Sequence, residues 1–336
     1  LSMSDRMQLI EGHFQKEKPL FVFSINFFPA ISDICEKLHT IYACWSVDCP
    51  VNELFTKQIK NSFNRVFLFD RTQYDRLYKY NPNGIFYLPL ATDVDIMDKA
   101  VNEITETDKK KFNSDISFIG SLYSEKNPLK DVKLDDFTTG YIDGLIKSQL
   151  LVFGCNFIED ALPDSIVEKI KGKDLSFDST VTVEPIDKYI AAHSFIGMKI
   201  AEEERRITLN YLAKDFNVDL YTLSDTKDLI NVNNKGQAKT LTEMPKIFNL
   251  SKINLNITMR PIQTGLPLRI FDILGSGGFL ITNYQAEIPE LFEIGQDLEV
   301  YTSLEELHEK CEYYLSHEEE RKAIAENGYK KVKAYH

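Results

Sequence analysis

The sequence has few cysteines and histidines, and neither residue type is arranged as a ligand set. No two of the cysteines have C-x-x-C spacing, and the six histidines are scattered. An odd cysteine count without such spacing is typical of free thiols in a reducing compartment and argues against a zinc site. We therefore expect a cytoplasmic protein. The five cysteines are Cys35, Cys44, Cys49, Cys155 and Cys311.

Other absences exclude whole classes of protein. The 336 residues contain no apolar run near the ~20 residues of a transmembrane helix, and residues 1–5 do not begin a signal peptide. The formal net charge of −12 argues against general nucleic-acid binding, which needs clustered lysine and arginine. The G-x-S-x-G and G-x-x-x-x-G-K-[ST] patterns are missing. The sequence therefore gives no support for an α/β-hydrolase or a P-loop NTPase.

Along most of the chain, apolar runs alternate with segments of helical periodicity. Continuous apolar strands separated by helices favour parallel sheets that are covered on both faces. We therefore predict an α/β protein with two Rossmann-like domains that face each other across a cleft. The predicted strands are 20–27, 40–44, 65–69 and 85–90 in the first domain, and 116–119, 218–221, 253–257, 279–282 and 298–301 in the second.

The predicted domain boundary follows a charged segment at 93–113, which we interpret as a solvated linker or helix face. The first domain is 1–112 and the second is 113–336, with a mostly helical insertion at about 127–195. The first domain lacks an opening strand with a glycine-rich turn. Either residues before Leu1 have been removed or this domain is minimal, and of the two we expect removal.

The segment Gly265 to Asn283 carries the strongest functional pattern, which is a loop, a helix, a glycine turn and a strand. Gly265 permits close approach of a ligand, and Pro267 suits a helix start. The free N–H groups and the dipole of that helix start suit a diphosphate. Asp272 has the position and chemistry to accept hydrogen bonds from a ribose diol, and Gly277-Gly278 ends the helix. The alternative is an ordinary capped helix with a solvated aspartate.

This segment resembles the C-terminal domain of group 1 glycosyltransferases, and the chain more closely resembles their CgeB-like branch. The resemblance covers most of the chain except the helical insertion. The matching motifs in the second domain are Ser251 to Asn256, Arg269 to Asp272 with Gly277-Gly278, Glu290 to Phe292, Tyr301 with Glu305 to Leu307, and Tyr313 to Leu315 followed by Arg321, Ile324, Ala325 and Gly328. Those in the first domain are Trp45 to Pro50, Phe69 to Arg71 and Tyr87 to Ala91.

The resemblance implies a GT-B fold and a glycosyltransferase of the hexosyltransferase type, which needs no metal. It implies transfer from a nucleoside-diphosphate sugar, UDP-linked, to a protein or glycan acceptor. Thr264 stands where the first glutamate of the family's E-x7-E pair is expected, so a non-catalytic relative stays open as an alternative. A sugar-nucleotide epimerase on the same fold is a second alternative, because a fold does not fix its function. The implied donor-binding residues are Gly120, Ser121, Lys126, Met244, Arg260, Gly265, Leu266, Arg269 and Asp272.

Two further acidic features, Asp48 and the Asp93-Val94-Asp95 motif, could have either a chemical or a purely structural role. Asp48 follows the predicted strand 40–44, and we interpret it as a candidate general base; the alternative is a helix-capping carboxylate. Asp93-Val94-Asp95 has the spacing of a divalent-metal motif, but such pairs are common by chance in an acidic sequence. We therefore predict no metal site. The sequence does not indicate the oligomeric state.

Overall fold

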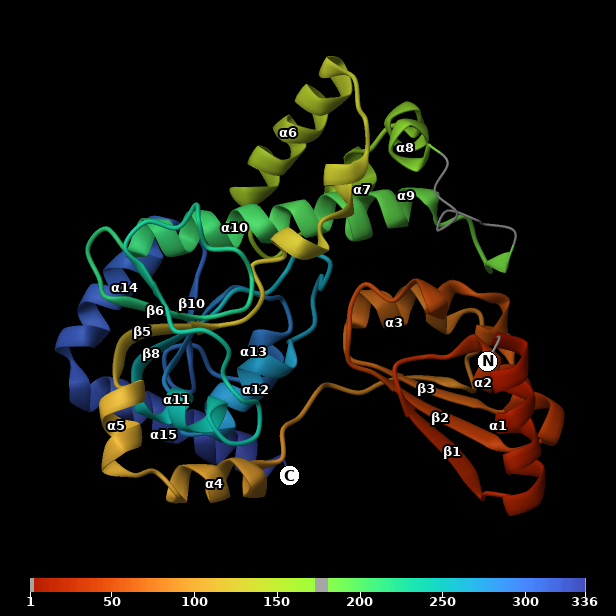
Figure 1. The fold of residues 1–336 in the computed structure, drawn as a ribbon, viewed down its shortest axis with the longest axis horizontal. Coiled ribbons are helices and arrows are strands. Elements are labelled where there is room, and N and C mark those ends of the chain that lie inside the picture. Colours follow the sequence, from red (N-terminus) through yellow and green to blue (C-terminus); the bar gives the residue numbers. More distant parts are fainter. Residues whose placement is uncertain (1–2, 173–180, 336) are drawn as a thin grey trace. The chain divides into compact units, whose positions relative to one another are not determined.

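The chain divides into two compact units in the computed structural model, which describes residues 3–172 and 181–335 (Figure 1). Unit 1 contains Leu1–Pro89 and Lys171–Ile190, and unit 2 contains Leu90–Ile170 and Ala191–His336. The division thus lies earlier than the boundary at 112/113 expected from the sequence. Residues 173–180 of the expected insertion lie outside the described residues.

Unit 1 contains a four-stranded parallel sheet with the strand order β1-β2-β3-β4. Its strands alternate with short helices, as the sequence pattern predicts. The elements are α1 (Met3–Glu17), β1 (Phe21–Ile25), α2 (Pro29–Leu38), β2 (Ile41–Ser46), the 3-10 helices Asn52–Phe55 and Lys57–Lys60, β3 (Asn64–Leu68), α3 (Arg71–Tyr78) and β4 (Ile85–Tyr87).

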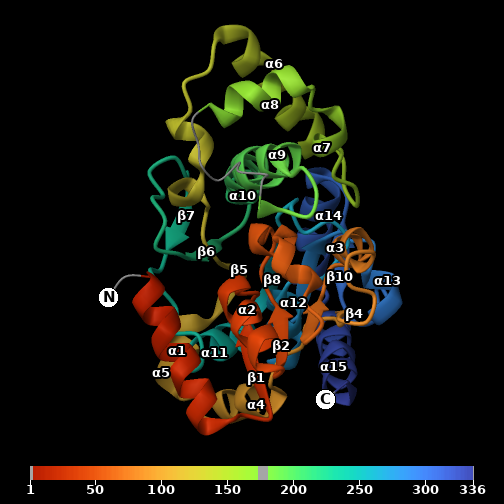
Figure 2. The same cartoon turned by 90° about the vertical axis from the view of Figure 1, so that its right-hand side faces the viewer.

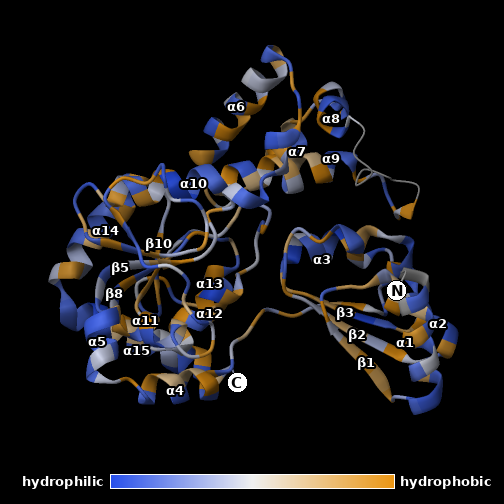
Figure 3. Ribbon diagram, in the orientation of Figure 1, coloured by the Kyte–Doolittle hydropathy of each residue, from blue (hydrophilic) through white to orange (hydrophobic). Residues whose placement is uncertain are grey.

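Only one face of this sheet is covered by the described residues of unit 1. Tyr42 and Val66 on that face are fully buried, and α2 is held against it by a hydrogen bond from Ser32 Oγ to Asn64 Oδ1 (2.7 Å). On the other face Phe23 is 54% exposed, and Ile25 is also exposed. Figure 3 shows the hydrophobic character of β1. The prediction of a buried strand at 20–27 is therefore wrong about burial, because the helices pack on one face alone.

Unit 2 contains a six-stranded parallel sheet with the strand order β10-β9-β8-β5-β6-β7. The order reverses between β5 and β8, which is the point where doubly wound sheets bind ligands. The elements are α4 (Val94–Asn102), α5 (Glu106–Phe112), β5 (Ser114–Ile119), α6 (Asp136–Leu150), α7 (Ile158–Ala161), α8 (Asp164–Lys171), α10 (Gly197–Leu212), β6 (Val218–Tyr221), β7 (Val232–Asn234), α11 (Met244–Leu250), β8 (Ser251–Asn256), α12 (Leu268–Gly275), β9 (Leu280–Asn283), α13 (Ile288–Leu291), β10 (Glu299–Tyr301), α14 (Leu304–Ser316) and α15 (Glu318–Ala334). The short helix α9 (Asp187–Tyr189), between α8 and α10 in the chain, belongs to unit 1.

Helices cover both faces of this second sheet. Figures 1 and 2 show α10 and α14 on one side and α11, α12 and α15 on the other. The residues of β6 and β9 are buried throughout, as are most residues of β5 and β8. The core includes Ile116, Ile253 and Ile281, each fully buried. This is the burial pattern expected of a two-sided parallel sheet.

The charged segment at 93–113 forms α4 and α5 rather than an extended linker. Asp93 caps α4 by accepting a hydrogen bond from the Ile96 N–H (3.1 Å). Thr105 and Asp108 form a capping box at α5. The Asp93-Val94-Asp95 motif is thus a helix start. Across residues 3–172 and 181–335, no group of three or more His, Cys, Asp or Glu side chains is placed to hold a metal ion.

The insertion is helical over its described residues, as predicted. The short 3-10 helices Ser124–Lys126 and Pro128–Asp131 precede α6, and a π-helix at Ile190–Ile196 joins α9 to α10. Among the described helices, none combines the length and the apolar character that a membrane span requires. The short edge strand β7 was not predicted.

Candidate functional site

An arginine from α10 lies at the carboxyl ends of β5 and β8, where the strand order of unit 2 reverses. The Nη1 of Arg205 donates to the Ser121 carbonyl (2.5 Å), which follows β5. Its Nη2 donates to the Ile257 carbonyl (2.8 Å), which follows β8. The guanidinium therefore bridges the two strand ends at the position where an open α/β sheet binds its ligand.

The surroundings of Arg205 leave its charge unbalanced. The side chain is only 9% exposed, and its Nε has no hydrogen-bond partner among the described residues. The guanidinium lies 4.5 Å from the ring of Tyr123 and 5.2 Å from that of Phe118. No carboxylate of the described chain forms an ion pair with it. Burial lowers the pKa of Arg205, opposed by Tyr123 and Glu204.

A second arginine, Arg269, lies near the first, at the start of α12. Its Nη1 is 3.4 Å from Asp272 Oδ2 and 3.8 Å from the sulfur of Met244. Burial lowers the pKa of Arg269; Asp272 opposes this effect, and the positive charge of Arg205 adds to it. The two guanidinium groups are therefore close enough for their positive charges to repel each other.

Asp272 is the carboxylate that pairs with Arg269. It is buried, and its Oδ1 accepts a hydrogen bond from the Thr92 hydroxyl (2.8 Å). Burial raises the pKa of Asp272, while Arg269 and Thr92 oppose the shift. Arg269 pairs with Asp272, whereas Arg205 has no ion-pair partner among the described residues, so the cluster has an excess of positive charge. Such an excess in a largely dry site favours an anionic ligand.

The first turn of α12 adds donors to this cluster. Pro267 precedes the helix, and no side chain caps it. In the part of the chain that the structure describes, the backbone N–H groups of Leu268 and Arg269 find no acceptor. Gly265 and Leu266 lead into this turn and are buried. Unpaired N–H groups and the positive end of the helix dipole complement a phosphate.

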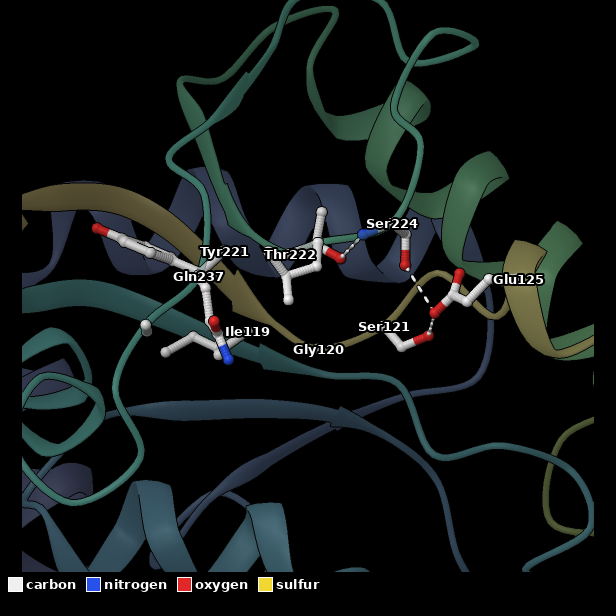
Figure 4. A pocket seen from close by; sticks show the side chains of 10 residues that line it. Ile119, Gly120, Ser121, Glu125, Tyr221, Thr222, Ser224 and Gln237 are labelled. Carbon is white, nitrogen blue, oxygen red and sulfur yellow. Dashed lines mark hydrogen bonds between the residues drawn. The ribbon is translucent and has the colours of Figure 1, made fainter.

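A pocket of 270 Å³ opens beside the cluster, at the carboxyl ends of β5 and β6 (Figure 4). The Glu125 carboxylate lies between two hydroxyl groups, accepting from Ser121 Oγ (2.6 Å) and Ser224 Oγ (3.1 Å). Gly120 lines the floor, and a Cβ added there would lie 3.3 Å from the ring of Phe118. Gln237, after β7, completes the polar lining. The pocket offers both donors and acceptors to a polar ligand.

Two of the predicted donor-binding side chains make other contacts. Arg260 is buried in an ion pair with Glu204 (2.6 and 3.2 Å) and donates to the Val152 carbonyl (2.8 Å). Its donors are therefore committed to structural contacts. Lys126 is exposed, with its ammonium 5.6 Å from the ring of Tyr123. Of the predicted set, the structure gathers Gly120, Ser121, Met244, Gly265, Leu266, Arg269 and Asp272 in this region of unit 2.

Sequence reasoning missed Arg205, although a signal was present. Ala201, Arg205, Thr208 and Leu212 follow each other at helical spacing and are buried on one side of α10. An arginine within an otherwise buried stripe is unusual and indicates a special role. The neighbouring charged residues at 202–206 hid this signal, because a charged run is typical of a solvated face.

In unit 1, polar side chains follow the carboxyl ends of the strands. Asp48 comes after β2 and is exposed, and its carboxylate accepts a hydrogen bond from the side-chain amide of Asn26, after β1 (2.6 Å). The 3-10 helix that follows has no side-chain cap, so Asp48 is not a helix cap. Asp70 does cap α3, by accepting from the Gln73 N–H (3.0 Å). The Asp48 carboxylate is therefore available to solvent and ligands.

Comparisons with known proteins agree with this description. Residues 205–336 match the protein family described as "Glycosyl transferase-like". Among curated proteins, none matches this sequence.

Several solved structures resemble the whole chain. A glycosyltransferase from Rickettsia africae has 13% sequence identity and a TM-score of 0.52, covering 98% of this chain and 76% of that one. HepE from Anabaena, solved in complex with UDP and glucose, has 9% identity and a TM-score of 0.55, with the same coverage. The N-terminal domain of a Candida albicans trehalose-6-phosphate phosphatase has 8% identity and a TM-score of 0.53, covering 98% of this chain and 70% of that one. The GT-B fold predicted from the sequence, with two parallel-sheet α/β domains, is thereby confirmed.

Proposed function

We propose that this protein is a glycosyltransferase that takes a hexose from a nucleoside-diphosphate sugar, UDP-linked, and transfers it to a protein or glycan. The observation that carries the proposal is the presence of two arginines beside the uncapped start of α12: Arg269 pairs with Asp272, and Arg205 has no ion-pair partner among the described residues. This arrangement suits a diphosphate. The similarity to a structure that contains UDP and glucose supports the same choice of donor.

Each part of the donor has a proposed binding group in unit 2. The diphosphate lies against Arg205, Arg269 and the first N–H groups of α12. Asp272 holds Arg269 in place and accepts a hydrogen bond from the ribose diol. The nucleoside extends toward the pocket of Ser121 and Gln237. Leu266 and Met244 contribute apolar contacts beside the helix start.

The chemistry follows from the charge that develops in glycosyl transfer. The departing diphosphate gains negative charge as the bond to the sugar breaks, and fixed positive groups in a dry site stabilise that charge. Two arginines supply this without a metal ion, so we propose a metal-independent reaction. Asp48 of unit 1 takes the proton of the acceptor hydroxyl in an inverting transfer. The CgeB-like branch and the cytoplasm stay our expected subfamily and location.

The test combines binding with turnover. Melting temperatures are measured with UDP, GDP and dTDP for the parent and for Asp272→Ala. UDP should stabilise the parent by about 2.7 kcal/mol at 100 times its Kd, and should stabilise the variant less. Equal stabilisation of both proteins would remove Asp272 from the site. Release of UDP from UDP-hexoses is then measured for the parent. Stabilisation without release would identify a binding protein instead of an enzyme.

A further inference from the structure

The turn after β1 is built around one asparagine that contacts the candidate base of the proposed reaction. Asn26 has a positive φ of 62°, a conformation that asparagine tolerates better than most residues. Its backbone N–H donates to the Trp45 carbonyl (2.8 Å), which ties the end of β1 to β2. The backbone conformation thereby directs the side chain toward the residues that follow β2.

The side chain of Asn26 uses both of its polar atoms on the same loop. Its Oδ1 accepts hydrogen bonds from the backbone N–H groups of Val47 (3.0 Å) and Asp48 (3.3 Å). Its Nδ2 donates to Asp48 Oδ2 at 2.6 Å. The amide therefore fixes the backbone and the carboxylate of Asp48 together. A short hydrogen bond to a charged acceptor is stronger than one between neutral groups.

A second layer of hydrogen bonds holds Asn26 itself. The Ser24 hydroxyl donates to the Asn26 carbonyl (2.8 Å) and lies 2.7 Å from the hydroxyl of Tyr42. The Tyr42 hydroxyl accepts a hydrogen bond from the backbone N–H of Phe28 (2.9 Å), at the start of α2. Tyr42 is fully buried. The asparagine is thus supported from the covered side of the sheet, whereas Asp48 is exposed.

We infer that Asn26 is a positioning residue, which holds one oxygen of the Asp48 carboxylate and leaves the other to accept a proton. This inference rests on the proposed function. In the described chain, Asp48 Oδ1 makes no hydrogen bond. A general base must present a free lone pair in a fixed direction. The Asn26 amide binds Oδ2 and so fixes the direction of Oδ1, and it does not compete for the proton that Oδ1 accepts. The other acidic group near this loop, Asp70, is committed to its helix cap.

Two substitutions separate positioning from folding. Asn26→Gly keeps the positive φ but removes the amide. It should lower kcat about tenfold, a part of the effect typical of general-base catalysis, and leave the KM for the donor unchanged.

Asn26→Asp places a second carboxylate beside Asp48, and such pairs retain a proton to higher pH. The acid limb of its pH–rate profile should therefore move to higher pH. Asn231→Gly is the matched control, because Asn231 also has a positive φ (59°) but lies in unit 2 outside the site.

A spectroscopic arm tests the contact without any turnover. The side-chain amide resonances of Asn26 should move with pH at acidic pH in the parent and should stay constant in Asp48→Asn. Resonances that do not move in the parent, or an Asn26→Gly variant with parental kcat, would overturn the inference. A parent that shows the resonance shift but releases no UDP from any UDP-hexose would contradict the proposed function, while the hydrogen bond itself would stand.

Discussion

The two parallel sheets of this protein differ in how they are covered. In unit 2, Phe118 on β5 is 3% exposed, whereas Phe23 on β1 of unit 1 is 54% exposed. The exposed residue lies in the more apolar strand, because β1 reads FVFSI and β5 reads SDISFI. The difference arises because α10 and α14 cover one face of the larger sheet and α11, α12 and α15 cover the other, while the described helices of unit 1 pack on one face. Burial is therefore a property of the layers around a strand.

The same contrast extends to charged residues. Unit 2 buries Arg205 and Asp272 next to the strand ends, where low polarity strengthens electrostatic interactions. Unit 1 keeps Asp48 exposed and holds it by hydrogen bonds from a neighbouring turn. A diphosphate needs fixed positive charge, whereas a base that meets a changing acceptor needs access. The proposed division of tasks follows this difference.

The largest expected effect is a loss of stability in the covered sheet. Ile253→Ala removes a fully buried side chain from β8. The lost packing and the cavity should lower the free energy of unfolding by about 2–5 kcal/mol. Denaturant titration with the parent as reference measures this change. A loss below about 1 kcal/mol would mean that the second sheet is as loosely covered as the first.

The next effect concerns the buried charge of unit 2. Burial raises the pKa of Asp272, so the folded protein retains this proton at pH values where the unfolded chain has lost it. Stability should fall as pH rises from about 4, the ordinary aspartate pKa, through the raised folded value. Asp272→Asn has no proton to lose. The unfolding free energy of the parent minus that of the variant should therefore decrease across this window. A difference that is constant with pH contradicts this prediction.

The smallest effect is expected on the open face of unit 1. Phe23→Ser removes an apolar ring that is more than half exposed. The free energy of unfolding should change by about 1 kcal/mol or less, because little buried area is lost. The same denaturant titration measures it beside Ile253→Ala. A loss as large as that of Ile253→Ala would show that this face is covered in solution.

Local patterns in the sequence predicted those features that depend on local chemistry. The bounds of β6 agree with the predicted range 218–221. Gly277 has a φ of 71° and follows the end of α12, as predicted. A Cβ on Gly278 would lie 2.6 Å from the Phe248 carbonyl, so this glycine also permits close packing. These features arise from backbone preferences and close packing within one short segment.

Features that depend on distant segments were not predictable in this way. The exposure of β1 depends on helices that pack on one face only, which the apolar run at 20–27 does not encode. Arg205 was missed because its position at the ends of β5 and β8 depends on the path of the chain through the insertion. Arg260 was predicted to bind the donor, but Glu204 on α10 holds it in a buried ion pair.

The central claim is that Arg205 and Arg269 bind the diphosphate of the donor. Calorimetric titration with UDP and UMP tests this claim most directly. UMP lacks the second phosphate, and a charged hydrogen bond contributes about 1.5–3 kcal/mol. The parent should therefore bind UDP at least about tenfold more tightly than UMP. This preference for UDP should largely disappear in Arg205→Gln. It should persist in the control variant Arg321→Gln, because Arg321 is also a buried arginine that donates to a backbone carbonyl. Equal affinities of the parent for UDP and UMP, or an unchanged preference in Arg205→Gln, would contradict the account.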